Sequence, residues 1–381
     1  MQDFKRFFSF NYLIERIKER GFRRCLQLFF FEIFCWMRPA LKKIWSGPDK
    51  ILYKNKNISN VMYAFYDLEV SPPTFDITWF LVLAESERIK NGCDFLHVII
   101  IPGKSDGFRK RDLPEYIELG GEFDIDTMWW RLRNILVPCC WLIPSCKQIT
   151  VCTSRLEAKG IQMSIAKYVF PEGYTVSFPE ANYDCKPIYC EEHSNVDFRS
   201  LRATPQALRY VNEWIKDKAG VRKIITITLR ECYDTARNSN LEVWGTFARS
   251  LDPKIYCPVI IRDTEAIFKS SPVEIDKLLV FPEVSWNIEL RMALYELSYL
   301  NMFVNSGPSV LCLLNSRTRY IVFKKIVSDI MEEYHRRRGI EAGVQIPHTN
   351  IFQRQVWDHD RIEIIEKEFK EMCDRIEGLT S

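Results

Sequence analysis

The chain has 381 residues, of which 47% are hydrophobic and 13% aromatic, which is enough for two domains with buried cores. Its formal net charge of +3 excludes a protein that binds nucleic acid through overall charge. The 13 cysteines and five histidines form neither CxxC pairs at zinc spacing nor an HExxH motif, so we expect reduced thiols in a cytoplasmic protein and no bound metal.

Residues 1–48 differ in composition from the rest of the chain. They carry ten Lys or Arg against four Asp or Glu, a local net charge of +6, around a dense apolar block from Cys25 to Met37. Glu32 interrupts this block, which is shorter than the roughly 20 residues that cross a bilayer, and no secretory cleavage site follows. We expect a basic amphipathic segment that lies on the inner face of an anionic membrane. The alternative is a helix packed on the protein body or on another subunit.

Strand-like and helix-like runs alternate through residues 49–200. Apolar periodicity and glycine or proline stops predict strands at 60–70, 94–102, 147–154 and 175–184, and helices at 77–92 and 127–142. Pro138 predicts a kink or an end in the second helix. Such alternation is typical of a parallel sheet flanked by helices.

A second alternating series occupies residues 201–355, after an irregular polar stretch at 184–204. It predicts helices at 204–220, 239–251, 287–300 and 309–315, and strands at 223–230, 256–263, 276–283, 302–308 and 319–325. Residues 356–381 form a carboxyl-terminal unit with a charged amphipathic helix over 358–376. We therefore expect an α/β protein with two doubly wound, Rossmann-like domains facing each other, divided within 190–221.

Polar residues gather where two strands of the second series end. Ligands of doubly wound sheets bind beyond the carboxyl ends of the strands. Asn305, Ser306 and Gly307 follow one strand and offer backbone amides to a phosphate, and Ser309 stands at the start of the next helix. A simple helix cap with a glycine turn is the alternative.

Arg230 stands at the end of the strand over 223–230. Its guanidinium offers a planar fork for a diphosphate, and Arg237 and Asn238 follow in the loop before the next helix. A structural ion pair of Arg230 with Glu231 at the rim of the sheet is the alternative.

Residues 222–325 resemble the donor-binding half of the GT-B glycosyltransferases. The resemblance lies in "TLRE" at the first strand end, in "RD" at 262–263 and in "FPEVSWNIELRMALYELSYLNMFVNSGPS". Arg230 is similar to the phosphate-binding arginine of fucosyltransferase-like members, and the helix after "QVWDHD" is similar to the carboxyl-terminal helix of such folds. The EX7E pattern of some retaining families is missing, so no family within the group is indicated.

The resemblance implies two domains facing a cleft, with a nucleotide-diphosphate sugar held by the second. Arg230 and the amides around 306–309 would stabilise the departing diphosphate. Donor-binding roles would fall to Arg237, Asn238, Asn305 and Ser309, and Glu283 in "FPEVSW" would lie near the base and ribose or be an ordinary loop acid. GT-B enzymes generally work without a divalent ion, so the sugar nucleotide is a co-substrate and no cofactor is expected.

The first domain should then present a glycan or lipid-linked acceptor and a general base. Asp67 and Glu69 follow its first strand, and a carboxylate there could take the proton of the acceptor hydroxyl, with Asp67 the first choice. A solvated polar loop, with Asp76 capping the next helix, is the alternative. His97 lies inside an apolar strand, which is typical of a core residue.

Three functional interpretations remain open from the sequence. The first is a glycosyltransferase of surface-polysaccharide biosynthesis, associated peripherally with the membrane through residues 1–48. The second is a nucleotide-sugar epimerase of the same architecture. The third is a non-catalytic relative that uses residues 1–48 to hold a partner or a membrane.

Overall fold

The computed structural model describes residues 60–110, 124–164, 168–183, 185–189, 196–232, 235–264, 266–324, 326, 332–333, 335–336, 340–345 and 347–378. The expectation for residues 1–48 lies outside this part of the chain. By its contacts the chain divides into two units, Met1–Asn57 with Ile161–Lys167, and Ile58–Gly160 with Tyr168–Ser381. Both sheets belong to the second unit. Within the described ranges, no helix has the length and apolar character that crossing a bilayer requires.

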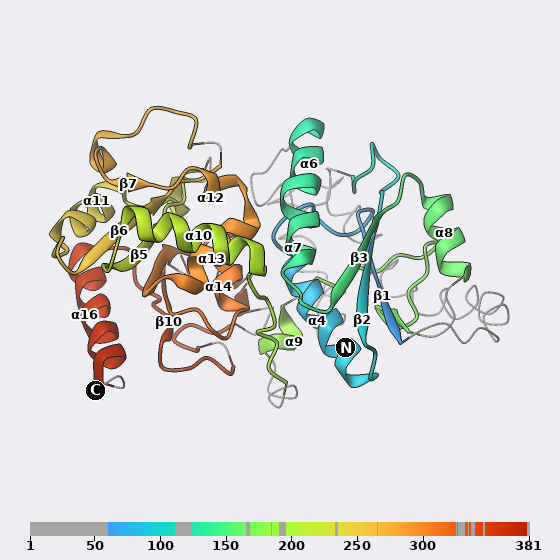
Figure 1. Cartoon of the computed structure of the whole chain (residues 1–381). Helices are drawn as coiled ribbons and strands as arrows, with labels where there is room; N and C mark the ends of the chain where they lie inside the picture. The colour runs from blue at the N-terminus through green and yellow to red at the C-terminus, as the bar shows by residue number, and fades with distance from the viewer. Residues whose placement is uncertain are drawn as a thin grey trace, which may run out of the picture. The chain divides into compact units, whose positions relative to one another are not determined.

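The first sheet has four parallel strands in the order β3-β2-β1-β4 (Figure 1). They are β1 (Val61–Asp67), β2 (Phe95–Ile101), β3 (Cys146–Val151) and β4 (Val169–Phe170). The helices that connect them are α4 (Ile77–Lys90), α6 (Ile125–Arg131), the π-helical turn Leu132–Leu136, α7 (Val137–Trp141) and α8 (Arg155–Ser164), and α9 (Lys186–Tyr189) follows. The expected parallel α/β arrangement is confirmed.

Two expectations for this half are changed by the structure. The strand expected at 175–184 is wrong, because the chain there closes a tight turn in which Phe178 N donates to Thr175 O at 3.1 Å. The pairing strand is the upstream β4. Pro138 does not end the helix, because a π-helical turn precedes it and Pro138 occupies the first turn of α7, while the expected kink stays a prediction.

The second sheet has six parallel strands in the order β10-β9-β8-β5-β6-β7. They are β5 (Lys223–Thr228), β6 (Tyr256–Ile261), β7 (Leu279–Val280), β8 (Leu300–Val304), β9 (Tyr320–Phe323) and β10 (Gln353–Gln355). Counted from β5 as the first strand, this is the 3-2-1-4-5-6 order of the Rossmann fold. The order reverses between β5 and β8, so the topological switch point lies between these two strands.

Helices cover both faces of the second sheet. They are α10 (Pro205–Lys218), α11 (Leu241–Ser250), α12 (Glu283–Trp286), α13 (Ile288–Leu297), α14 (Ser309–Leu313) and α16 (Ile362–Gly378), with 3-10 turns at Thr235–Arg237 and Val273–Ile275. One face packs Ile227 and Met302 against Trp244 of α11 and Met372 of α16, which lie side by side. The other face packs Phe303 and Val322 among residues of α13 and α14. The expected doubly wound sheet is confirmed, while the domain limits at 48, 200 and 355 stay predictions.

The local signals for this half explain its elements. Thr204 Oγ1 accepts a hydrogen bond from Ala207 N at 3.3 Å, which is the cap expected at the start of α10. The strand β5 is buried at five of its six positions, as its β-branched sequence KIITIT favours. These two elements and α11 place the loop after β5 at the carboxyl edge of the sheet.

Candidate functional site

The loops after β5 and β8 meet at the switch point. Thr228 of β5 pairs with Phe303 of β8, so Arg230 and Asn305, each two residues further on, take neighbouring places at the carboxyl edge. The structure therefore brings Arg230 together with the loop 305–309. This edge is where doubly wound sheets bind their ligands.

Arg230 has a fixed backbone and an unpartnered side-chain nitrogen. Its N–H donates to Ser239 Oγ at 2.9 Å, and its carbonyl accepts from Ser239 N at 3.0 Å. Its Nε is buried and has no hydrogen-bond partner within the described residues. A buried donor without a partner is costly, so an arginine of this kind is suited to an anion that arrives with the substrate.

Glu231 pairs with a different arginine. Its carboxylate accepts two hydrogen bonds from Arg262, at 2.7 Å from Nη2 and 3.1 Å from Nε. Arg262 follows β6, the neighbour of β5. The ion pair at the rim of the sheet, which was the structural alternative for Arg230, is therefore made by Arg262 and leaves Arg230 available.

The loop after β8 offers a ligand one side-chain hydroxyl, that of Ser306. Ser306 Oγ is buried and has no hydrogen-bond partner in the described part of the chain. Three of the expected unpaired amides are already used, because Asn305 N donates to Phe323 O at 3.0 Å, Ser306 N to Ser309 Oγ at 3.3 Å and Ser309 N to Ser306 O at 3.2 Å, and the role of the Gly307 amide stays a prediction. Ser309 is only 1% exposed, and its hydroxyl also donates to Ser306 O. Ser309 therefore shapes the loop, and Ser306 is the hydroxyl left for a ligand.

Gly307 is required by a close approach. A Cβ at this position would lie 2.8 Å from Cδ2 of Phe75, a residue of the loop after β1. A contact under 3.0 Å forces a displacement, so any larger residue would have to displace the Phe75 ring or the loop that carries it. The glycine expected for phosphate approach thus has a packing reason as well.

The other donor-binding candidates, Asn238, Arg237 and Glu283, differ in their surroundings. The Asn238 side chain closes the turn after β5, because its Oδ1 accepts from Cys232 N at 2.9 Å and its Nδ2 donates to Cys232 O at 2.7 Å. Asn238 therefore shapes the loop instead of offering its amide. Arg237 ends the 3-10 turn in that loop, and its donor-binding role stays a prediction. Glu283 is exposed at the start of α12, after β7, and the sheet order places β6 between β7 and β5, away from Arg230.

Asp67 is fully hydrogen-bonded inside the protein. Its carboxylate is 1% exposed and receives Arg155 Nη1 at 2.7 Å and Nη2 at 2.9 Å. The Tyr174 hydroxyl and Glu69 N donate to the same carboxylate. Burial, with the adjacent Asp67 carboxylate, raises the pKa of Tyr174 well above its ordinary value. With four donors in place, the buried Asp67 carboxylate has no free lone pair for an acceptor hydroxyl, which argues against the expectation that it is the base.

Glu69 remains as the candidate base of this loop. Its side chain is partly exposed, and Oε2 accepts from Lys104 N, while Lys104 Nζ lies 3.9 Å from Oε1. His97 has the core role that its position predicts: Nε2 lies 2.8 Å from Thr150 Oγ1, and burial lowers its pKa to about 4. Asp76 bonds to the hydroxyl of Thr74, in the turn before α4, and makes no side-chain cap.

No metal site is found where the structure can be described, since no three His, Cys, Asp or Glu side chains gather there as a metal site would require. The expectation that no metal is used stays a prediction. Sequence reasoning missed Lys324 and Asp360, which hold the loop of Arg230 in place. Their partners are near in space and far in sequence, so no local pattern marks them.

Comparisons with known proteins give structural neighbours. No family model and no curated protein sequence matches the chain. A glycosyl transferase of family 9 from Veillonella parvula matches 84% of this chain and 93% of its own, at 10% identity and a TM-score of 0.46. The ADP-heptose lps heptosyltransferase II of E. coli matches 83% and 99%, at 7% identity and a TM-score of 0.47.

A third solved structure is the fucosyltransferase NodZ from Bradyrhizobium. It matches 67% of this chain and 94% of its own, at 12% identity and a TM-score of 0.28.

Proposed function

We propose that the chain is a GT-B glycosyltransferase that transfers a sugar from a nucleotide-diphosphate donor to a glycan or lipid-linked acceptor. The observation that carries the proposal is the pair of buried, unpartnered groups at the switch point, Arg230 Nε and Ser306 Oγ. A diphosphate that accepts from both would complete their hydrogen bonding.

The same two groups would act during the reaction. As the bond between the sugar and the diphosphate breaks, negative charge develops on the departing oxygen, and a fixed guanidinium in a partly buried site stabilises it. This step needs no divalent ion. Asn305 and Arg237 belong to the same two loops and complete the donor site in this proposal.

Glu69 is the proposed general base. It would take the proton from the acceptor hydroxyl as that oxygen attacks the sugar carbon. The acceptor lies on the side of the first sheet, and residues 1–48 bring the enzyme to the inner face of a membrane, where a lipid-linked acceptor is available.

Titration calorimetry with UDP, GDP, ADP and CDP tests the donor site. We expect at least one diphosphate to bind, and Arg230→Ala to weaken that binding about ten- to a hundredfold, since hydrogen bonds to charged groups contribute about 1.5–3 kcal/mol. Arg209→Ala, which removes an exposed arginine from α10, is the control and should change nothing. If none of the four diphosphates bound the unaltered protein, the proposal would fail.

The engagement of Asp67 favours one second candidate, a non-catalytic relative that binds the donor without turnover. It differs from the enzyme in one measurement. Release of free sugar or of nucleoside diphosphate from the donor, measured with and without membranes as acceptor, should be seen for an enzyme and stay at background for a non-catalytic binder.

A further inference from the structure

A buried carboxylate stands at the start of α11. Asp360 precedes α16 and is 4% exposed. Its Oδ2 accepts from Asn240 N at 2.7 Å and from Trp244 Nε1 at 3.0 Å. Lys324, after β9, places Nζ 3.8 Å from Oδ1 and donates to Asn238 O at 2.7 Å. Three segments that are distant in sequence thus meet at this point.

The location is the phosphate position of a Rossmann fold. The helix after the first strand of the order 3-2-1-4-5-6 holds the pyrophosphate of a dinucleotide at its amino end. In this sheet the first strand is β5 and that helix is α11. Because a carboxylate of the chain itself already accepts there, a ligand phosphate at the same place would meet a like charge in a buried environment.

The bonds continue from Asp360 to Arg230. Ser239 lies between Asn238 and Asn240, whose backbones are held by Lys324 and Asp360. Ser239 in turn bonds both the N–H and the carbonyl of Arg230. Lys324 has a φ of +55°, which is unfavourable for a residue with a side chain and is kept only where surrounding contacts impose it. Lys324 and Asp360 therefore hold the loop that in turn holds the backbone of Arg230.

We propose that Asp360 is a built-in anion that occupies the phosphate position at α11 and, together with Lys324, positions Arg230 for a diphosphate bound on the β8 side of the switch point. This inference rests on the proposed function. It implies that the ligand is a nucleoside diphosphate or its sugar ester and not a dinucleotide, whose pyrophosphate would need the position at α11. Asp360 is a positioning residue, since it acts through Ser239.

The test uses the full chain and two probes, inorganic pyrophosphate and whichever of UDP, GDP, ADP or CDP binds. Asp360→Ala should weaken both probes about tenfold or more, and formate at tens of millimolar should restore binding, because a small carboxylate can refill the place of the side chain. Asp360→Asn keeps the shape of the side chain and loses its charge. Its affinity for both probes should therefore lie between that of the unaltered protein and that of Asp360→Ala. Asp358→Ala removes an exposed carboxylate of the same segment and should bind as the unaltered protein does.

A second readout separates positioning from general stability. Arg230→Ala and Asp360→Ala should be non-additive, so the double variant binds pyrophosphate no more weakly than Arg230→Ala alone. Additive losses would show that Asp360 acts only on stability and would overturn the inference, as would unchanged binding in Asp360→Ala or loss without rescue by formate. Tight binding of NAD by the unaltered protein would also overturn it. Absence of all binding by the unaltered protein would instead overturn the proposed function, and the inference with it.

Discussion

Asp67 and Glu69 follow the same strand, but their carboxylates have different surroundings. Asp67 is enclosed and paired with Arg155, while Glu69 is partly exposed beside Lys104. A carboxylate that accepts four hydrogen bonds holds its loop together, because every oxygen lone pair already has a donor. A carboxylate with spare acceptor capacity can receive a proton from a substrate.

The two carboxylates should therefore respond differently to neutralisation. Asp67→Asn should lower the free energy of unfolding by about 3–5 kcal/mol, since it leaves the charge of Arg155 poorly matched. Glu69→Gln should keep that free energy within about 0.5 kcal/mol and lower turnover about a hundredfold or more. Urea unfolding and a donor-turnover assay measure the two effects. A stable, inactive Asp67→Asn protein beside an active Glu69→Gln protein would reverse the assignment.

His97 gives the protein a calculable sensitivity to acid. Burial lowers its pKa to about 4, against about 6.5 for a histidine in an unfolded chain. The unfolded state takes up the proton first as the pH falls, so stability is lost progressively between about pH 6.5 and pH 4, by up to about 3 kcal/mol. His97→Gln should lose less stability over this interval in urea unfolding, while His359→Gln, at an exposed position, should follow the unaltered protein.

At the scale of elements, sequence patterns succeed where an element carries its own signal. β5 and α10 are examples, since a run of β-branched residues lies inside the first and a Thr-Pro start lies at the beginning of the second. β4 and β10 have two or three residues and exist only through pairing, as of Phe170 with Ala64. No periodicity can appear in so few residues, so these strands could not be predicted.

The candidate site divides in the same way. The positions of Arg230 and of the loop 305–309 could be predicted, because both follow parallel strands and the carboxyl ends of parallel strands lie at one edge of the sheet. The partners of the charged groups could not be predicted from pattern. Arg155 stands 88 residues from Asp67, and Arg262 stands 31 residues from Glu231. Which carboxylate is engaged and which guanidinium is left over therefore became visible only in the folded chain.

Two glycines inside helices should respond oppositely to alanine. At Gly245 of α11, a Cβ would lie 1.9 Å from the carbonyl oxygen of Glu274, so helix and backbone would have to separate. At Gly160 of α8, no atom lies within 4 Å of the Cβ position. We expect Gly245→Ala to destabilise by about 2 kcal/mol or more and Gly160→Ala to stabilise by about 0.5–1 kcal/mol. Thermal unfolding measures both, and a stabilised Gly245→Ala protein would show that the approach is not as close as described.

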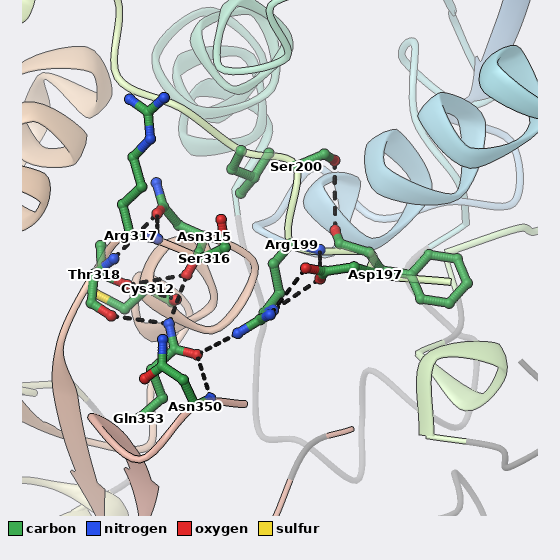
Figure 2. Close-up of polar contacts among 12 residues, drawn as sticks. Asp197, Arg199, Ser200, Cys312, Asn315, Ser316, Arg317, Thr318, Asn350 and Gln353 are labelled. Carbon is green, nitrogen blue, oxygen red and sulfur yellow. Dashed lines mark hydrogen bonds and ion pairs between the residues drawn. The ribbon is translucent and has the colours of Figure 1, made fainter. Parts of the chain in front are cut away.

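At the scale of the whole molecule, a buried polar network fixes the segment that connects the two series (Figure 2). Gln353, 3% exposed at the start of β10, forms four hydrogen bonds through its side-chain amide. Its Nε2 donates to Asn315 O and Thr318 O at 2.9 Å each, and its Oε1 accepts from Arg199 Nη1 at 2.6 Å and from Asn350 N at 3.3 Å. The segment is also bonded directly, since Leu201 N donates to Leu314 O at 3.0 Å.

Replacing Gln353 should loosen this attachment without touching the candidate site. Gln353→Leu removes four hydrogen bonds, two to the carbonyls of Asn315 and Thr318 and two from Arg199 and the Asn350 N–H, which should lower the free energy of unfolding by roughly 2–4 kcal/mol. Amide exchange should accelerate at Leu201 and Thr318, while Gln206→Ala, at an exposed position of α10, should leave exchange unchanged.

The network lies at the amino ends of β9 and β10, and Arg230 lies at the carboxyl edge. Diphosphate affinity in the folded variant should therefore stay within about twofold, since sites without shared partners behave additively. A loss as large as that of Arg230→Ala would mean that the two edges of the sheet are energetically coupled, contrary to this account.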